Sequence, residues 1–169
     1  SFDSAQIYNN ASFLGEAIAH CGIPRKAFFL TSKIWVTHHS YEDTIEAVKT
    51  LLTEFRTNYL DALLIHWPSA HGDALLWQSR NAGTWRAFED LYESGVVHAI
   101  GVSNFLPHHL VPLLSRARIA PMINQLEIHA GYPQAHAVNF CRRAGIVVQS
   151  WGPFGRGQLL DNPFVREIA

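Results

Sequence analysis

Four polar side chains stand where apolar, strand-like runs of this sequence end, namely Asp3, Tyr8, Lys33 and His66. Lys33 closes the run 27–32, and His66 closes the run 61–65. A lysine or histidine at the end of a buried strand is costly unless it has a partner or a chemical task. When successive strands of an alternating β/α sequence carry such residues at their carboxyl ends, the pattern predicts one shared active site at one face of a parallel barrel.

The types of these residues suit the movement of a proton. Tyrosine, with a reference pKa of about 10, is a poor donor at neutral pH, and a neighbouring ammonium lowers that pKa by favouring the phenolate. Lys33 could supply this charge to Tyr8, and Asp3 could hold Lys33 charged and oriented. We therefore expect Tyr8 to be a general acid. Taken singly, a tyrosine such as Tyr8 is more often an aromatic residue beside a helix, a histidine such as His66 is more often a core residue, and Asp3 could cap a turn.

Strand-like runs alternate with helical segments along the chain, which is typical of repeated βα units. The predicted strands are residues 28–33, 62–66, 97–102, 122–126 and 146–150.

The helices carry their own boundary signals. Ser40 is a predicted N-cap, Gly95 ends a helix predicted over about 84–94, and Pro107 begins the next helix. The connection 69–83 has no clear period, and we expect it to be a loop that lines the substrate site.

The motifs at these strand ends resemble those of the aldo-keto reductases, and the resemblance extends over nearly the whole chain. Five motifs follow in the family's order: Phe2-Asp3-Ser4-Ala5-Gln6-Ile7-Tyr8, Thr31-Ser32-Lys33-Ile34-Trp35, Leu63-Leu64-Ile65-His66-Trp67-Pro68, Gly101-Val102-Ser103-Asn104-Phe105 and Asn124-Gln125-Leu126-Glu127-Ile128-His129. The later segment 149–155 resembles the bacterial reductases of keto-sugars and small carbonyls.

This resemblance implies a parallel (β/α)8 TIM-type barrel that reduces an aldehyde or ketone to an alcohol by hydride transfer from NADPH, or from NADH. The implied catalytic residues are Asp3, Tyr8, Lys33 and His66. Tyr8 would be the acid, and His66 would donate a hydrogen bond to the carbonyl oxygen. Two alternatives stay open: a non-catalytic nicotinamide-binding or structural member of the fold, and an unrelated barrel hydrolase that uses His66 with carboxylates.

The resemblance also places a cofactor site on the later strands. The implied cofactor-binding residues are Ser103, Asn104, Gln125, Trp151, Pro153, Phe154 and Gly155, with Arg156 continuing the last loop. Uncharged amides and hydroxyls suit a carboxamide because they both donate and accept. Trp151 stands where the family usually has a tyrosine that stacks on the nicotinamide ring, and an indole can also stack there. The strand and helix that would bind an adenosine 2′-phosphate are not in this sequence, so the preference for NADPH enters by resemblance alone.

Two tryptophans lie within two residues after Lys33 and His66. Trp35 comes after Lys33 and Trp67 after His66, and we expect both to line the substrate pocket or else to pack against the long loop.

The sequence also departs from the family's pattern at Ala11, a position where the family commonly has a glutamate.

The length of the chain limits the folds that it can form. The 169 residues suffice for one domain, which we expect to be a single (β/α) barrel over 1–169. A complete barrel needs about 250 residues, so we expect the first and last strands to be missing and the physical protein to be longer. We predict a monomer once the chain is complete.

Charge and residue usage exclude several classes of partner. The net charge of −1, without runs of either sign, argues against a nucleic-acid or membrane surface. Only Cys21 and Cys141 are present, which favours reduced thiols in a cytoplasmic protein. Glu127 and His129 lack a third ligand at a useful spacing, so no metal is predicted. The expected partner is a small carbonyl compound.

Overall fold

A parallel sheet dominates the computed structural model, which describes residues 1–69 and 76–168. Its strand order, β1-β2-β3-β4-β5-β6, is the order of the strands along the chain. The strands are β1 (Phe2–Asp3), β2 (Leu30–Ile34), β3 (Ala62–Ile65), β4 (Ile100–Ser103), β5 (Ile123–Glu127) and β6 (Val147–Trp151). The expected architecture of consecutive parallel βα units is confirmed, and the described residues supply six of the eight strands of a (β/α)8 barrel.

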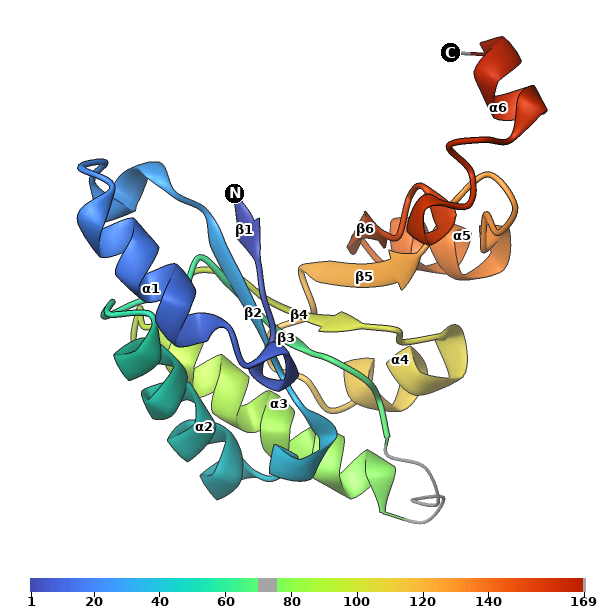
Figure 1. Cartoon of the computed structure of the whole chain (residues 1–169). Helices are drawn as coiled ribbons and strands as arrows, with labels where there is room; N and C mark the ends of the chain where they lie inside the picture. The colour runs from blue at the N-terminus through green and yellow to red at the C-terminus, as the bar shows by residue number, and fades with distance from the viewer. Residues whose placement is uncertain (70–75, 169) are drawn as a thin grey trace.

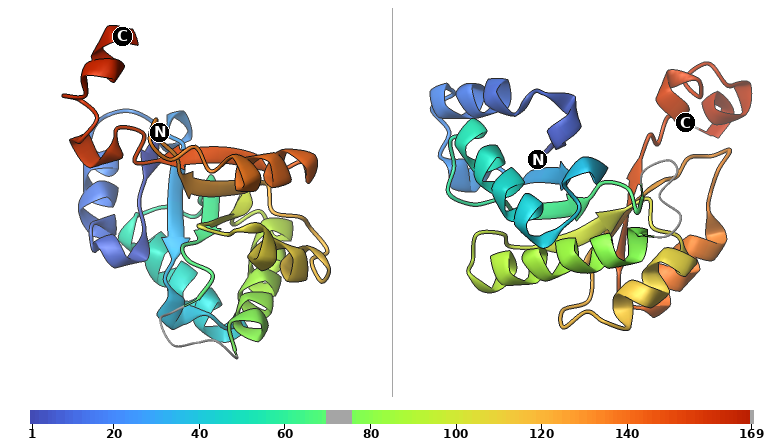
Figure 2. Two further views of the ribbon diagram at one scale, coloured as in Figure 1. Left: turned by 90° about the vertical axis from the view of Figure 1, so that its right-hand side faces the viewer. Right: turned by 90° about the horizontal axis from the view of Figure 1, so that it is seen from below.

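Helices cover the outer side of this curled sheet (Figures 1 and 2). They are α1 (Ala11–His20), α2 (Tyr41–Glu54), α3 (Trp77–Glu93), α4 (Pro107–Leu114) and α5 (Ala135–Arg143). A further short helix, α6 (Pro163–Ile168), follows β6. Short 3₁₀ turns occupy Gln6–Tyr8, Arg25–Ala27, Val36–His38 and Gly155–Gly157. Figure 1 shows α6 projecting away from the sheet. None of the helices in the described part of the chain is long and apolar enough to cross a membrane.

Local signals in the sequence account for several helix boundaries. Ser40 caps α2 by accepting a hydrogen bond from the Asp43 backbone N–H at 3.0 Å. Gly95 follows α3 with a φ of 76°, a left-handed conformation that glycine adopts without strain. Pro107 begins α4, as predicted.

Helix α3 begins earlier than the sequence indicated. We expected a loop over 69–83, whereas the helix begins at Trp77, and residues 70–75 lie outside the described residues. This first part of the helix is held by tertiary contacts rather than by an apolar stripe. Asn81 Nδ2 donates to the Pro68 carbonyl oxygen at 2.8 Å, and Gly83 allows a close approach, because a Cβ there would lie 3.2 Å from the Tyr41 nitrogen.

The core lies between the sheet and helices α2, α3 and α4. Apolar side chains from these elements share complete or nearly complete burial: Leu30, Ile34, Val48, Leu51, Phe55, Leu63, Ile65, Trp85, Phe88, Val102 and Leu110. Burial of each such side chain contributes about 1.5–3 kcal/mol relative to an exposed one. Strands β2, β3 and β4 are buried along their whole length, whereas the edge strands β1 and β6 are largely exposed. The buried central strands therefore form the rigid part that carries the polar strand ends.

Candidate active site

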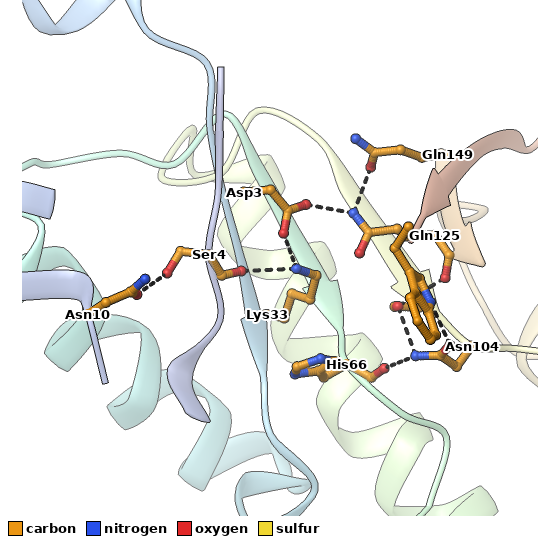
Figure 3. A network of polar contacts seen from close by, with 10 residues as sticks. Asp3, Ser4, Asn10, Lys33, His66, Asn104, Gln125 and Gln149 are labelled. Atoms are coloured by element: carbon orange, nitrogen blue, oxygen red, sulfur yellow. Dashed lines mark hydrogen bonds and ion pairs between the residues drawn. The ribbon is translucent and has the colours of Figure 1, made fainter. Parts of the chain in front are cut away.

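Lys33 and Asp3 form an ion pair on the inner side of the sheet (Figure 3). The Lys33 side chain lies in β2 and is almost completely buried, at 1% exposure. Its Nζ donates to Asp3 Oδ1, at the end of β1, and to the Ser4 carbonyl oxygen at 3.1 Å. A buried ammonium is tolerated only with such partners, so the pair holds β1 against β2 at the strand ends.

Tyr8 lies in the 3₁₀ turn that follows β1, above the Lys33 ammonium. Lys33 Nζ is 5.3 Å from the centroid of its ring, a cation–π distance. Burial, and secondarily the negative charge of Asp3, raise the pKa of Tyr8 above its ordinary value. We expected Lys33 to lower this pKa, but the ion pair with Asp3 offsets the charge that Lys33 presents. Tyr8 therefore stays protonated through the physiological range of pH.

His66 directly follows β3 and packs its ring against two aromatic neighbours. The Tyr8 ring lies edge-on at 5.7 Å between centroids, and the Trp35 ring lies edge-on at 5.1 Å. Burial, with a smaller contribution from the Lys33 charge, lowers the pKa of His66 to about 4. The imidazole is therefore neutral at physiological pH. Its Nδ1 is buried without a hydrogen-bond partner among the described residues, so the ring can offer only Nε2 to a ligand.

Gln125, in β5, joins both sides of the site (Figure 3). Its Nε2 donates to Asp3 Oδ2 at 2.6 Å and to Gln149 Oε1 at 3.0 Å. Both amide hydrogens are thereby used, and Oε1 accepts no hydrogen bond from the described residues. Gln149 was not predicted from the sequence to belong to the site. Its position two residues before Trp151, on the same side of a strand, is the signal that could have found it.

Ser103 and Asn104 end β4 and are linked to its neighbours. Ser103 Oγ donates to the Gln125 carbonyl oxygen at 2.9 Å. Asn104 Nδ2 donates to the His66 carbonyl oxygen at 2.9 Å and to Ser103 Oγ at 3.1 Å. Asn104 has a φ of 63°, a left-handed conformation that asparagine adopts more readily than most residues. These polar groups are therefore oriented before any ligand arrives.

An open cavity of about 450 Å³ lies over these strand ends. Its lining residues are Asp3, Tyr8, Lys33, His66, Trp67, Ser103, Asn104, Gln125, Gln149, Ser150, Trp151, Gly152, Pro153 and Arg156. The structure thus brings together the predicted quartet and most of the predicted cofactor residues in one cavity.

Three predicted site residues are not among those that line this cavity. Trp35 packs on the His66 ring and is not among the residues that line the cavity. Phe154 is 61% exposed, and Gly155 begins a 3₁₀ turn. Arg156, in that turn, lines the cavity and places its guanidinium carbon 5.8 Å from the centroid of the Trp151 ring.

Comparison with known proteins decides the family. The sequence model of the aldo/keto reductase family matches residues 1–164. The chain belongs to this family. A glyoxal reductase of Bacillus subtilis is 41% identical over 169 residues, a match that covers 100% of this chain and 58% of the relative.

Solved structures of the family superpose closely on the fold. An aldo-keto reductase from a Medee basin deep-sea metagenome library has a TM-score of 0.91 and 39% identity, covering 99% of this chain and 60% of that one. An aldo-keto reductase of Bombyx mori in complex with NADP has a TM-score of 0.85 and 30% identity, covering 99% and 59%. The chain therefore spans about three fifths of the length of the proteins that it matches.

The cavity of this aldo/keto reductase fits a nicotinamide. Gln125 Oε1 and the second lone pair of Asn104 Oδ1 are two acceptor positions on residues that line the cavity, which suits a carboxamide N–H group. The half-buried Trp151 ring offers an aromatic surface. Within residues 1–69 and 76–168 there is no group of three or more residues that could hold a metal ion. Glu127 Oε1 and His129 Nε2, the pair considered from the sequence, lie 3.9 Å apart.

Proposed function

We propose that the protein reduces a small aldehyde or ketone to an alcohol with NADPH, or with NADH. The observation that carries this proposal is the T-shaped arrangement of one protonated phenol and one neutral imidazole, with ring centroids 5.7 Å apart, beside a wall of amide groups. This arrangement suits a carbonyl oxygen that gains negative charge and must then receive a proton.

Tyr8 is the proposed proton donor. The bound nicotinamide would supply a hydride to the carbonyl carbon. The carbonyl oxygen then becomes an alkoxide, which is far more basic than a phenolate, so the phenolic proton of Tyr8 moves to it downhill. The raised pKa of Tyr8 keeps the proton in place until that charge develops. The Lys33 ammonium, 5.3 Å from the ring centroid, would partly offset the repulsion between the Asp3 carboxylate and the phenolate that remains.

His66 and Asp3 are proposed to position and support this transfer. Neutral His66 carries its proton on Nε2, because a buried Nδ1–H without an acceptor would be costly, and this N–H donates to the carbonyl oxygen. A donor aimed at the oxygen where charge develops stabilises the transition state. Asp3 holds the Lys33 ammonium through their ion pair.

The residues of β4, β5 and β6 are proposed to hold the nicotinamide. Gln125 Oε1 and Asn104 Oδ1 would accept from the carboxamide, and the Trp151 ring would stack on the nicotinamide ring. The Bombyx mori relative binds NADP, which supports the choice of NADPH. Trp67, 41% exposed at the cavity, would form an apolar wall for the substrate. The similarity to a protein named glyoxal reductase supports a small carbonyl compound as the substrate of this chain.

The test is NADPH oxidation by the complete polypeptide with a panel of glyoxals, keto-sugars and aromatic aldehydes. We expect NADPH to be oxidised only when a carbonyl compound is present, with one molecule of alcohol formed for each NADPH consumed. Binding of NADPH without turnover of any member of the panel would instead favour a non-catalytic nicotinamide-binding protein.

A further inference from the structure

Trp151 makes a directional contact in addition to offering its ring surface. Its indole Nε1–H donates to Asn104 Oδ1 at 2.9 Å. Trp151 ends β6 and Asn104 follows β4, and these two strands are separated in the sheet by β5. The bond therefore crosses over one whole strand and ties the two walls of the cavity together.

The orientation of the Asn104 amide is determined by its other partners. The His66 backbone oxygen can only accept, so it must face the Asn104 NH₂ group, and the distance is 2.9 Å. Oδ1 then points toward β6, where the indole N–H meets it. The amide thus connects Trp151 to the backbone of His66 in a single chain of hydrogen bonds.

An aromatic ring needs no N–H group in order to stack on a ligand. Phenylalanine would also offer a flat surface at position 151, but it could not donate to Asn104. The indole ring also contacts Arg156, whose guanidinium carbon lies 5.8 Å from the ring centroid, and that contact does not depend on the N–H group. The N–H bond is therefore a separable property of Trp151.

We propose that Trp151 is a positioning residue, whose indole N–H locks the Asn104 amide and, through it, the end of β3 that carries His66. This inference rests on the proposed function for the identity of the ligand. With Asn104 held, Oδ1 keeps its remaining lone pair directed at the cavity, and a nicotinamide carboxamide meets an acceptor that is already oriented. Preorganisation of this kind lowers the entropic cost of binding.

The test separates the ring surface from the N–H group in the complete polypeptide. NADP⁺ affinity is measured by titration for Trp151→Phe, Asn104→Gly and the double variant, since glycine adopts the left-handed φ of position 104 without strain. Loss of one hydrogen bond corresponds to a roughly three- to tenfold weaker affinity. We expect that loss in Trp151→Phe, and no further loss when the same change is made in the Asn104→Gly background.

Trp85→Phe is the matched control. The Trp85 indole also donates a hydrogen bond, to the Ile119 carbonyl oxygen at 3.0 Å, but Trp85 is buried away from the cavity. This variant should lose stability while NADP⁺ affinity stays unchanged. A second readout is hydrogen exchange of the Trp151 indole N–H by NMR, which should be slow in the wild type and become fast in Asn104→Gly.

Several outcomes would overturn the positioning role. The first is an NADP⁺ affinity of Trp151→Phe equal to that of the wild type. The second is a loss of NADP⁺ affinity from Trp151→Phe that is as large in the Asn104→Gly background as in the wild type. The third is rapid hydrogen exchange of the indole N–H in the wild type. NADP⁺ binding is independent of turnover, so a protein that binds NADP⁺ but reduces no carbonyl would contradict the proposed function and leave this inference intact. A wild-type protein that does not bind NADP⁺ would overturn both.

Discussion

Gln125 Nε2 lies 2.6 Å from Asp3 Oδ2, although the two residues are 122 positions apart in the chain. Asp3 belongs to β1 and Gln125 to β5, which are not neighbours in the sheet. The hydrogen bond therefore spans the inner side of the curled sheet, and it exists only because the sheet curls (Figures 2 and 3). The Asp3 carboxylate is consequently held from two sides, by Lys33 and by Gln125.

Gln125→Glu should destabilise the fold at neutral pH. It places a second carboxylate within hydrogen-bond distance of Asp3, and like charges at this distance raise the pKa of one member of the pair. We expect the free energy of unfolding at pH 7 to fall by about 1–3 kcal/mol, and to recover as the pH is lowered toward 5, because one carboxyl group then takes a proton.

Chemical denaturation at the two pH values measures this effect. Gln149→Glu is the control, since the position is exposed and a carboxylate can still accept from Gln125. If the free energy of unfolding at pH 7 fell equally in both variants, repulsion between position 125 and Asp3 would not be the cause.

Removing Asp3 or Lys33 singly from their ion pair should lower the stability of the fold by unequal amounts. Asp3→Asn leaves the Lys33 ammonium buried without its counter-ion, whereas Lys33→Met leaves a carboxylate that is 39% exposed and can be hydrated. We expect the free energy of unfolding to fall by about 2–4 kcal/mol in Asp3→Asn and by a smaller amount, about 1–2 kcal/mol, in Lys33→Met. Equilibrium unfolding of both variants decides the order, and a larger cost for Lys33→Met would refute the argument.

Tyr8→Phe should abolish most of the proposed reduction without weakening cofactor binding. The change removes the phenolic proton and keeps the ring that packs on His66. A positioned acid contributes roughly 10²- to 10⁴-fold in rate, and kcat should fall by that factor. Steady-state kinetics and NADP⁺ titration measure the two effects. Tyr41→Phe, which removes a hydroxyl bonded to Asp90 on the helical surface, should turn over normally. Unchanged kcat in Tyr8→Phe would reject Tyr8 as the acid.

Acid should destabilise the protein through His66, which is buried, and His109, which is half-buried. Burial lowers the pKa of His66 and of His109 from 6.5 to about 4. The unfolded chain therefore binds more protons than the folded one between these values, and stability present above pH 6.5 is lost as the pH falls toward 4. For His66, the free energy of unfolding should fall by at most about 3 kcal/mol over this range of pH.

His109→Gln should flatten this pH dependence. Nδ1 of His109 accepts from the Leu106 backbone N–H at 3.1 Å, and glutamine at the same helix position can also accept there without titrating. Unfolding free energies measured in steps from pH 6.5 to 4 give the slope. The same slope in the variant and the wild type would exclude a contribution from His109.

Features that depend on neighbouring residues were predictable from the sequence. The Ser40 cap, the left-handed Gly95 and the start of α4 at Pro107 follow from local backbone preferences. The strands were also predicted, with ends within three residues of those observed, because alternation and apolar runs reflect burial. The gathering of Asp3 and Lys33 followed from one rule, that parallel strands end at the same face.

Contacts that depend on sheet curvature and on desolvation were decided only by the tertiary structure. The bonds from Gln125 to Asp3 and from Trp151 to Asn104 join strands that are not adjacent, so no spacing in the sequence encodes them. The early start of α3 depends on Asn81 reaching the Pro68 carbonyl oxygen. The direction of the Tyr8 pKa shift was predicted wrongly, because burial and the net field of an ion pair depend on distances in three dimensions rather than on residue types.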